Sequence, residues 1–141
     1  MFIPKETKFK KQFKGRKFNK IGKPKELLSI YNSLNIIRLR SLGHSRITDS
    51  QLFSLRQTVV KKLKKQGRFS IKLFADTPVS KKPLEIRMGK GKGAVNSWVA
   101  KLIPGATIIE LYGVSDVKAF NILKEIQKKL PLNTYIDCLK K

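Results

Sequence analysis

Hydrophobic residues recur at helical spacing in two segments, 48–66 and 115–130. In the first, Thr48 and Gln51 form the T-x-x-Q pattern of a capping box, and Gly67 stands where a helix C-cap is expected. Both segments are predicted to be helices with one apolar face. The stripe of the first is Leu52, Leu55, Val59 and Leu63, and that of the second is Val117, Phe120, Leu123, Ile126 and Leu130.

Other segments alternate apolar with polar residues or hold short apolar runs, the pattern of strands. Residues 27–42 are mixed, and a helix or a strand fits their first half, but Ile37-Arg38-Leu39-Arg40 alternates as a half-buried strand with its arginines on the open face. Residues 76–83 read as a turn region. Pro104-Gly105 is expected to make a hairpin-like connection between two strands. The other predicted strands are 68–75, 84–88, 94–103, 106–113 and 134–139.

This order of elements predicts an α+β fold, with two helices packed on a mixed, largely antiparallel sheet. The chain has 141 residues, which suggests one domain, residues 26–141. Residues 1–25 carry ten Lys/Arg and one acid, too little apolar surface to fold alone. They are predicted to form a basic arm that orders on a polyanion. Its phenylalanines, Phe9, Phe13 and Phe18, stack on bases or dock on the domain.

Charge changes the picture most. Lys and Arg number 32 against 9 Asp and Glu, a formal net charge of +23. Such a balance points to a polyanionic partner, nucleic acid first and a membrane surface second. No run of ~20 apolar residues is present, so no membrane span is expected. Cys138 and His44 stand alone, which predicts neither an intramolecular disulfide nor a metal site.

A lysine cluster occupies the last turns of the first predicted helix. Its members are Lys61, Lys62, Lys64 and Lys65. Lysines there suit the helix dipole, and plain solvation is the alternative to a role in binding. In so basic a chain, contact with phosphates is the favoured interpretation.

The segment 87–93 carries the most specific pattern, Arg87-Met88-Gly89-Lys90-Gly91-Lys92-Gly93. Glycines allow close backbone approach and lysines supply charge for phosphates. The P-loop motif fails because no Ser or Thr follows a Gly-Lys pair, and the spacing is not G-x-G-x-x-G. A glycine-rich hairpin without a ligand is the other interpretation. We expect a cationic finger that contacts an RNA backbone.

No catalytic constellation accompanies this loop, so neither an enzyme nor a cofactor is expected. An enzyme that uses the loop as a phosphate cradle would need an acid or base beside it. Glu85 is the one nearby candidate, and strand alternation would pair it with Arg87 instead. A DNA-binding architectural protein is a third hypothesis, weakened by the lack of a helix-turn-helix spacing or a minor-groove wedge.

Four stretches resemble ribosomal protein L-sixteen of the large subunit, the universal uL-sixteen family, of bacterial or organellar type. They are PKETKFKKQFKGR at 4–16, KKQGRFSIKLFADTPVSKKPLEIRMGKGKG at 64–93, WVAKLIPG at 98–105 and KKLP at 128–131. Residues 21–45 depart from the glycine-rich stretch of bacterial members. The resemblance implies an α/β-hammerhead-like fold and a structural role in the large ribosomal subunit, bound to its rRNA.

Its implied partners are large-subunit rRNA, tRNA at the aminoacyl site near the peptidyl-transferase centre, and neighbouring large-subunit proteins. The loop 87–93 is expected at the tRNA. Composition rich in Lys, Asn, Ile and Phe, with no secretory h-region at its start, favours a chain encoded in a mitochondrion; a bacterial cytoplasm or a plastid is the alternative. The residues expected to bind rRNA are Lys5, Lys8, Lys10, Lys11, Lys14, Arg16, Lys17, Arg38, Arg40, Arg46, Lys61, Lys62, Lys64 and Lys65.

Overall fold

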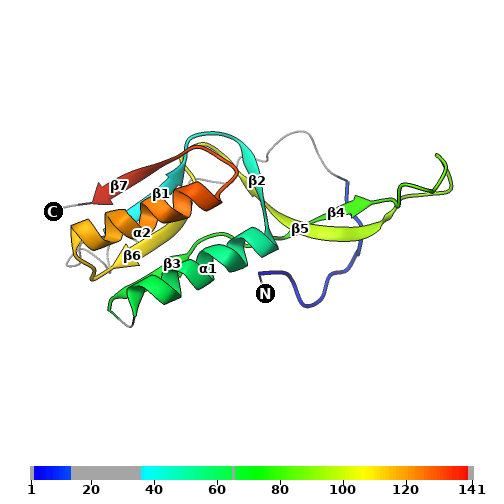
Figure 1. Cartoon of the computed structure of the whole chain (residues 1–141). Helices are drawn as coiled ribbons and strands as arrows, with labels where there is room; N and C mark the ends of the chain where they lie inside the picture. Colours follow the sequence, from blue (N-terminus) through cyan, green and yellow to red (C-terminus); the bar gives the residue numbers. More distant parts are fainter. Residues whose placement is uncertain (1, 14–35, 65, 140–141) are drawn as a thin grey trace.

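The computed structural model describes residues 2–13, 36–64 and 66–139. They contain two helices and seven strands in an α+β arrangement, as the sequence predicts (Figure 1). The elements are β1 (Ile36–Ser41), β2 (Ser45–Thr48), α1 (Asp49–Leu63), β3 (Arg68–Ile71), β4 (Thr77–Lys81), β5 (Ala94–Leu102), β6 (Thr107–Tyr112), α2 (Asp116–Lys129) and β7 (Thr134–Leu139).

The strands form two sheets rather than the single one expected. A four-stranded sheet has the order β3-β6-β1-β7, and a three-stranded sheet has the order β2-β5-β4. Every strand pair in the described part of the chain is antiparallel. The α+β class is therefore confirmed, with antiparallel pairing throughout these residues.

The expected hairpin at Pro104-Gly105 is wrong. β5 and β6 lie in different sheets, and the turn carries the chain from one to the other. Gly105 has a φ of 79°, and its N–H donates to the Ser41 carbonyl at 2.8 Å. The Ser41 N–H in turn donates to the Ala106 carbonyl at 3.0 Å. The turn thus bonds to the end of β1, where the chain also leaves the four-stranded sheet.

Helix α1 begins with the predicted capping box. Gln51 N–H donates to Thr48 Oγ1 at 3.3 Å, and Thr48 N–H donates to Gln51 Oε1 at 3.0 Å. Its end differs from the expectation, because the helix stops at Leu63 and Lys64 takes the left-handed conformation, with φ 45°. Gly67 is not the cap. It lies in the turn before β3, where an added Cβ would meet the Tyr112 carbonyl oxygen at 2.7 Å.

The apolar stripe of α2 is only partly as predicted. Leu123 and Ile126 are fully buried, and Ala119 and Ile122 join them. Val117, the first residue of the expected stripe, is 75% exposed. Helix α2 packs on β1 and β7, and α1 packs on α2, β3, β2 and β5.

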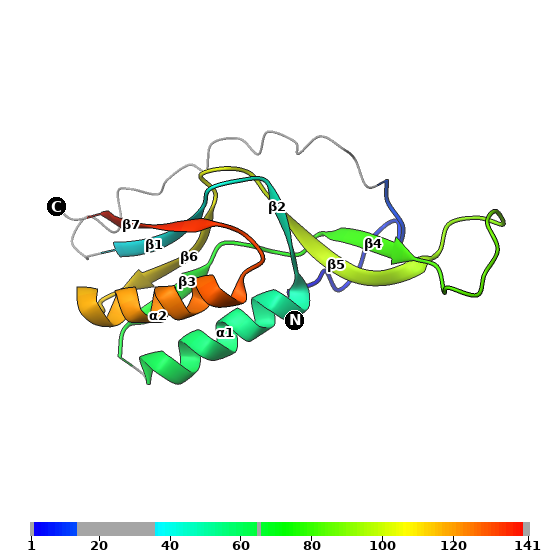
Figure 2. The ribbon, with the colours of Figure 1, turned by 45° about the horizontal axis from the view of Figure 1, so that its top comes forward.

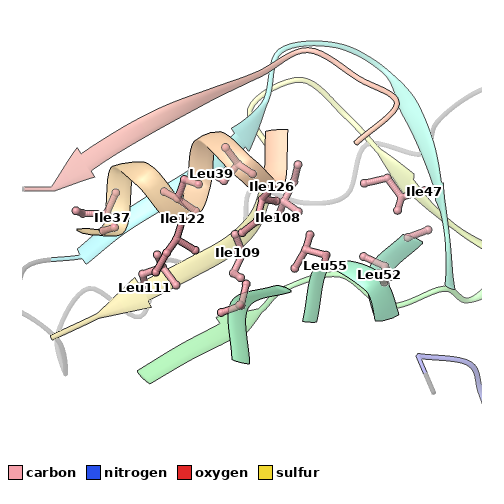
Figure 3. Close-up of a cluster of buried hydrophobic side chains, with 14 of the residues drawn as sticks. Ile37, Leu39, Ile47, Leu52, Leu55, Ile108, Ile109, Leu111, Ile122 and Ile126 are labelled. Carbon is pink, nitrogen blue, oxygen red and sulfur yellow. The ribbon is translucent and has the colours of Figure 1, made fainter. Parts of the chain in front are cut away.

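The core lies between the helices and one face of the four-stranded sheet (Figure 3). Ile37 and Leu39 of β1 face it, and alternation sends Arg38 and Arg40 to the other face. Leu52 and Leu55 of α1 close it from below, and Ile47 extends it to the three-stranded sheet. Trp98 is half-buried against this cluster.

Strands β4 and β5 form a long hairpin that leaves the body, with residues 82–93 at its far end (Figure 2). Two predictions are wrong here. Residues 77–81, expected as a turn, are β4; Pro78 is accommodated because β4 is an edge strand, where it pairs in register with Trp98. Residues 84–88, expected as a strand, belong to the loop. They alternate, but no described strand lies beside them, and Leu84, Ile86 and Met88 are all exposed.

Candidate nucleic-acid interface

The tip of the β4–β5 loop is built on left-handed backbone. Gly89, Lys90 and Gly91 have φ of 96°, 52° and 88°. Glycine adopts such angles without strain, and lysine does so at a cost. A Cβ added at Gly89 or Gly91 would meet no atom within 4 Å. These two glycines therefore serve the conformation of the tip.

Gly93 works differently. Its φ is not positive, but a Cβ there would lie 2.6 Å from the Lys81 carbonyl oxygen. The third glycine thus lets the two strands of the hairpin approach each other where the loop begins. The close neighbour of Gly93 is thus its own chain, and the approach of the three glycines to RNA stays a prediction.

The loop presents cations to solvent. All residues from Pro83 to Lys92 are exposed, including Arg87, Lys90 and Met88. Glu85 is the one acid among them. Lys82, which the sequence analysis did not single out, donates its ammonium to the Gly89 carbonyl and so ties the loop's two sides together. No sequence motif marks this lysine, because its partner is a main-chain oxygen.

The structure describes the N-terminal arm over residues 2–13, and its ordering on a polyanion stays a prediction. Phe2 packs against the core cluster, and Ala75 N–H donates to the Phe2 carbonyl at 2.9 Å. Phe9 and Phe13 remain 65% and 94% exposed. The basic side chains of the described arm, all exposed, are Lys5, Lys8, Lys10 and Lys11. Lys14, Arg16 and Lys17 lie outside the described residues.

The far end of the arm meets the Gly-Lys loop. Lys11 Nζ donates to the Lys92 carbonyl at 2.8 Å, and Lys92 Nζ donates to the Gln12 carbonyl. The Lys92 ammonium also lies 5.6 Å from the centre of the Phe13 ring, a cation–π distance. Two segments far apart in the sequence, both expected to bind RNA, thus meet through these contacts.

The arginines of β1 do not lie on an open face. Arg38 is 7% exposed and its Nε lies 3.1 Å from Glu110 Oε1. Arg40 Nε lies 3.1 Å from Asp137 Oδ2, with 21% of the side chain exposed. The acids stand on β6 and β7, the strands flanking β1. These ion pairs use both guanidinium groups within the sheet, whereas Arg46 on β2 is exposed.

The lysine cluster of α1 divides in a similar way. Lys61 and Lys64 are exposed, and Lys65 lies outside the described residues. Lys62 Nζ lies 2.8 Å from Glu125 Oε1 on α2. The hydrogen bond from Lys62 holds the pKa of Glu125 below its ordinary value. Lys62 therefore links the two helices, while its neighbours face solvent.

The described residues offer no other evident site. They hold no group of three His, Cys, Asp or Glu side chains placed for a metal ion. None of the helices in the described ranges is long and apolar enough to span a membrane. The cationic arm and loop are therefore the features of this surface that the sequence and geometry both single out.

Comparison with known proteins gives a family match over nearly the whole chain. The model of the family described as "Ribosomal protein L16p/L10e" matches residues 4–137. The large ribosomal subunit protein uL16 of Caulobacter vibrioides strain NA1000 / CB15N is 42% identical over 136 residues, which are 96% of this chain and 92% of that protein. The protein of the same name from strain ATCC 19089 / CIP 103742 / CB 15 has the same identity and coverage.

Proposed function

The chain belongs to the ribosomal protein L16p/L10e family, and we propose that it binds large-subunit rRNA through its arm and basic surface and presents the loop 87–93 to the aminoacyl-tRNA site. Membership makes it a structural component of the large ribosomal subunit and not an enzyme. Neighbouring large-subunit proteins are among its partners.

The observation that carries the proposal is the position and chemistry of the loop. It lies at the far end of a hairpin that leaves the body, so it reaches a partner that the core does not touch. Its backbone is left-handed at the tip, and Arg87 and Lys90 are exposed there. Such a finger neutralises phosphates and offers no general acid or base for chemistry. Positioning of tRNA is the function that fits it.

The rRNA surface we propose is smaller than the sequence alone suggests. It comprises the exposed basic residues of the arm, with Arg46, Lys61 and Lys64 on the body. Arg38, Arg40 and Lys62 are left out because acids within the fold already engage them. A net charge of +23 supplies the long-range attraction, and compaction of such a chain is favoured by a polyanion around it.

A mitochondrial ribosome is the assembly we propose for this chain. Its support is a composition rich in Lys, Asn, Ile and Phe, which fits an AT-biased genome. The similarity to Caulobacter vibrioides proteins is equally what a bacterial or plastid ribosome would give. Sedimentation of ribosomes from separated compartments, followed by detection of this chain, tests the assignment: finding it in cytoplasmic bacterial or plastid ribosomes overturns it.

Crosslinking in purified large subunits tests the proposed contacts. A photoreactive residue at Lys90 is expected to crosslink to tRNA bound at the aminoacyl site, and one at Lys61 to rRNA. A photoreactive residue at Val117, exposed on α2, serves as the matched control for an exposed but uncharged position. Crosslinks from position 90 to rRNA alone would remove the tRNA role and leave an rRNA anchor.

A further inference from the structure

We infer that the described arm, residues 2–13, is a brace that sets the position of the Gly-Lys loop, and that Lys92 is a positioning residue in this brace rather than a phosphate contact. What the brace positions, a tRNA-binding loop, rests on the proposed function. The contact between arm and loop does not, because it lies within the chain itself.

The loop has little of its own to hold it. Side chains from Pro83 to Lys92 are exposed, so no apolar packing fixes them. Within the loop, Lys82 binds the Gly89 carbonyl, and Ile86 N–H donates to the Pro83 carbonyl at 3.4 Å. A segment with few buried contacts and solvent-exposed hydrogen bonds opens readily. A defined orientation therefore needs a second support.

The arm has the anchorage that the loop lacks. At its start, Phe2 packs on the core and its carbonyl accepts from Ala75 N–H, just before β4. Ten residues of extended chain span at most about 33–36 Å. The arm crosses the hairpin near β4 (Figure 1), and the Lys11 side chain reaches the Lys92 carbonyl on the side of the loop that leads into β5. The arm is thus attached to the body at Phe2 and to the loop at Lys92.

At its far end the arm is joined to the loop by two opposed hydrogen bonds, which we call the clamp. Lys11 donates to the main chain of Lys92 at 2.8 Å, while the Lys92 side chain donates to the main chain of Gln12 and lies over the Phe13 ring. Both hydrogen bonds are charge-assisted, since each joins an ammonium to a carbonyl oxygen. Two opposed contacts of this kind fix both the distance between the arm and the loop and their relative orientation, whereas one contact alone does not.

Charge makes the clamp responsive to RNA. Lys8, Lys10, Lys11 and Lys92 all lie at the junction or on the arm beside it, and carbonyl groups do not cancel their mutual repulsion. A polyanion along the arm removes that repulsion and favours the closed clamp. Binding of rRNA by the arm thus strengthens a contact that is already formed in the free protein, which is a coupling between two binding surfaces.

The brace separates two lysines that the sequence pattern treats alike. Lys92 turns inward to the arm, whereas no hydrogen bond, ion pair or ring contact joins Lys90, at the left-handed tip, to the described arm residues. Lys90 and Arg87 are the cations left to meet a ligand. The two lysines are therefore expected to respond differently to the same substitution.

Nitrogen-15 relaxation in the free protein tests the clamp without a ribosome. In the wild type, order parameters of the Gly91 and Gly93 amides are expected near about 0.85, the value of rigid backbone. Lys92→Met, which keeps the aliphatic stem, is expected to lower them below about 0.6 and to loosen residues 11–13 together with them. Lys92→Arg should restore both. Lys90→Met is the matched control and should leave both unchanged.

Two outcomes overturn the inference: loop and arm that stay rigid in Lys92→Met, or equal loosening in Lys90→Met. Neither touches the proposed tRNA role. Conversely, if Lys92→Met frees the loop but ribosomes carrying it accept aminoacyl-tRNA at the normal rate, the clamp stands and the tRNA role fails.

Discussion

Arg38 and Glu110 face each other in register across β1 and β6, with Arg38 Nε 3.1 Å from Glu110 Oε1 and each side chain 9% exposed. Lys72 Nζ lies 3.2 Å from the other carboxylate oxygen, and the Tyr112 hydroxyl also bonds to it. The positive charge of Arg38, which the sequence assigned to the RNA-binding surface, is thus paired with Glu110 inside the sheet. Removal of one partner of such a buried pair is costly, because the other stays desolvated.

Arg38→Ala is therefore expected to destabilise the free protein by about 3 kcal/mol, at the lower end of the range for a broken buried pair because Lys72 still faces Glu110. Arg46→Ala, an exposed arginine on the neighbouring sheet, is the control and should change stability by less than ~0.5 kcal/mol. Denaturant unfolding measures both. A loss below ~1 kcal/mol for Arg38→Ala would return this residue to the list of RNA contacts.

The two classes of lysine on α1 predict different salt dependence of RNA binding. Lys61→Ala and Lys64→Ala should each reduce the slope of log affinity against log salt by about one unit, since each removes a phosphate contact. Lys62→Ala should leave the slope nearly unchanged, because Glu125 already engages Lys62. Filter binding to large-subunit rRNA over a salt series gives the slopes. If Lys62→Ala changes the slope as much as the other two variants, then Lys62 also contacts phosphate and the distinction between the two classes of lysine is wrong.

The Lys62–Glu125 pair also predicts a titration. The pKa of Glu125 is lowered from 4.5, first by the hydrogen bond from Lys62 and then by the charges of Lys62, Lys129 and Lys128. A depressed carboxyl pKa adds stability that is present above the unfolded value and is lost as pH falls through the folded one. This contribution is therefore expected to fade below about pH 4.5.

Carbon-detected NMR titration of the Glu125 carboxyl is the measurement. Lys62→Met should raise its pKa toward the ordinary value, and Lys61→Met, which removes an adjacent charge without a hydrogen bond to Glu125, should raise it less. An equal rise of the Glu125 pKa in both variants would mean that the overall positive charge lowers it, and not the hydrogen bond from Lys62.

The glycines of the loop separate two physical roles. Gly93→Ala places a methyl group 2.6 Å from the Lys81 carbonyl, so the hairpin must shift, at a cost of about 1–3 kcal/mol. The methyl group of Gly89→Ala would meet no atom within 4 Å, so the free energy of unfolding falls by only about 1 kcal/mol, for the positive φ. The effect is confined to the loop. Thermal unfolding distinguishes them: a Gly89→Ala loss as large as that of Gly93→Ala would contradict the assignment.

The sequence predicts those features that depend on neighbours along the chain. The capping box at Thr48 and Gln51 and the apolar stripe of α1 are local, and both are confirmed. The same local signal misleads at Leu84, Ile86 and Met88, because alternation marks a strand only where another strand lies beside it. Periodicity carries no information about that neighbour.

The candidate site shows the same limit. The Gly-Lys loop is exposed, as its composition predicts, and the lysines of the described arm are exposed as well. However, the burial of Arg38 depends on Glu110, and the inward turn of Lys92 depends on Gln12 and Phe13. These partners lie far along the chain, and charge counting treats every cation as free. The fold decides which of them remain for RNA.

We propose that the loop positions tRNA while the rest of the chain binds the rRNA of the large subunit. Ribosomes carrying Lys90→Ala test it most directly, through the rate of aminoacyl-tRNA accommodation and the sedimentation of the large subunit. We expect normal sedimentation and accommodation slowed about tenfold, the equivalent of ~1.4 kcal/mol of lost charge-assisted contact. Normal accommodation in fully assembled ribosomes would contradict the account.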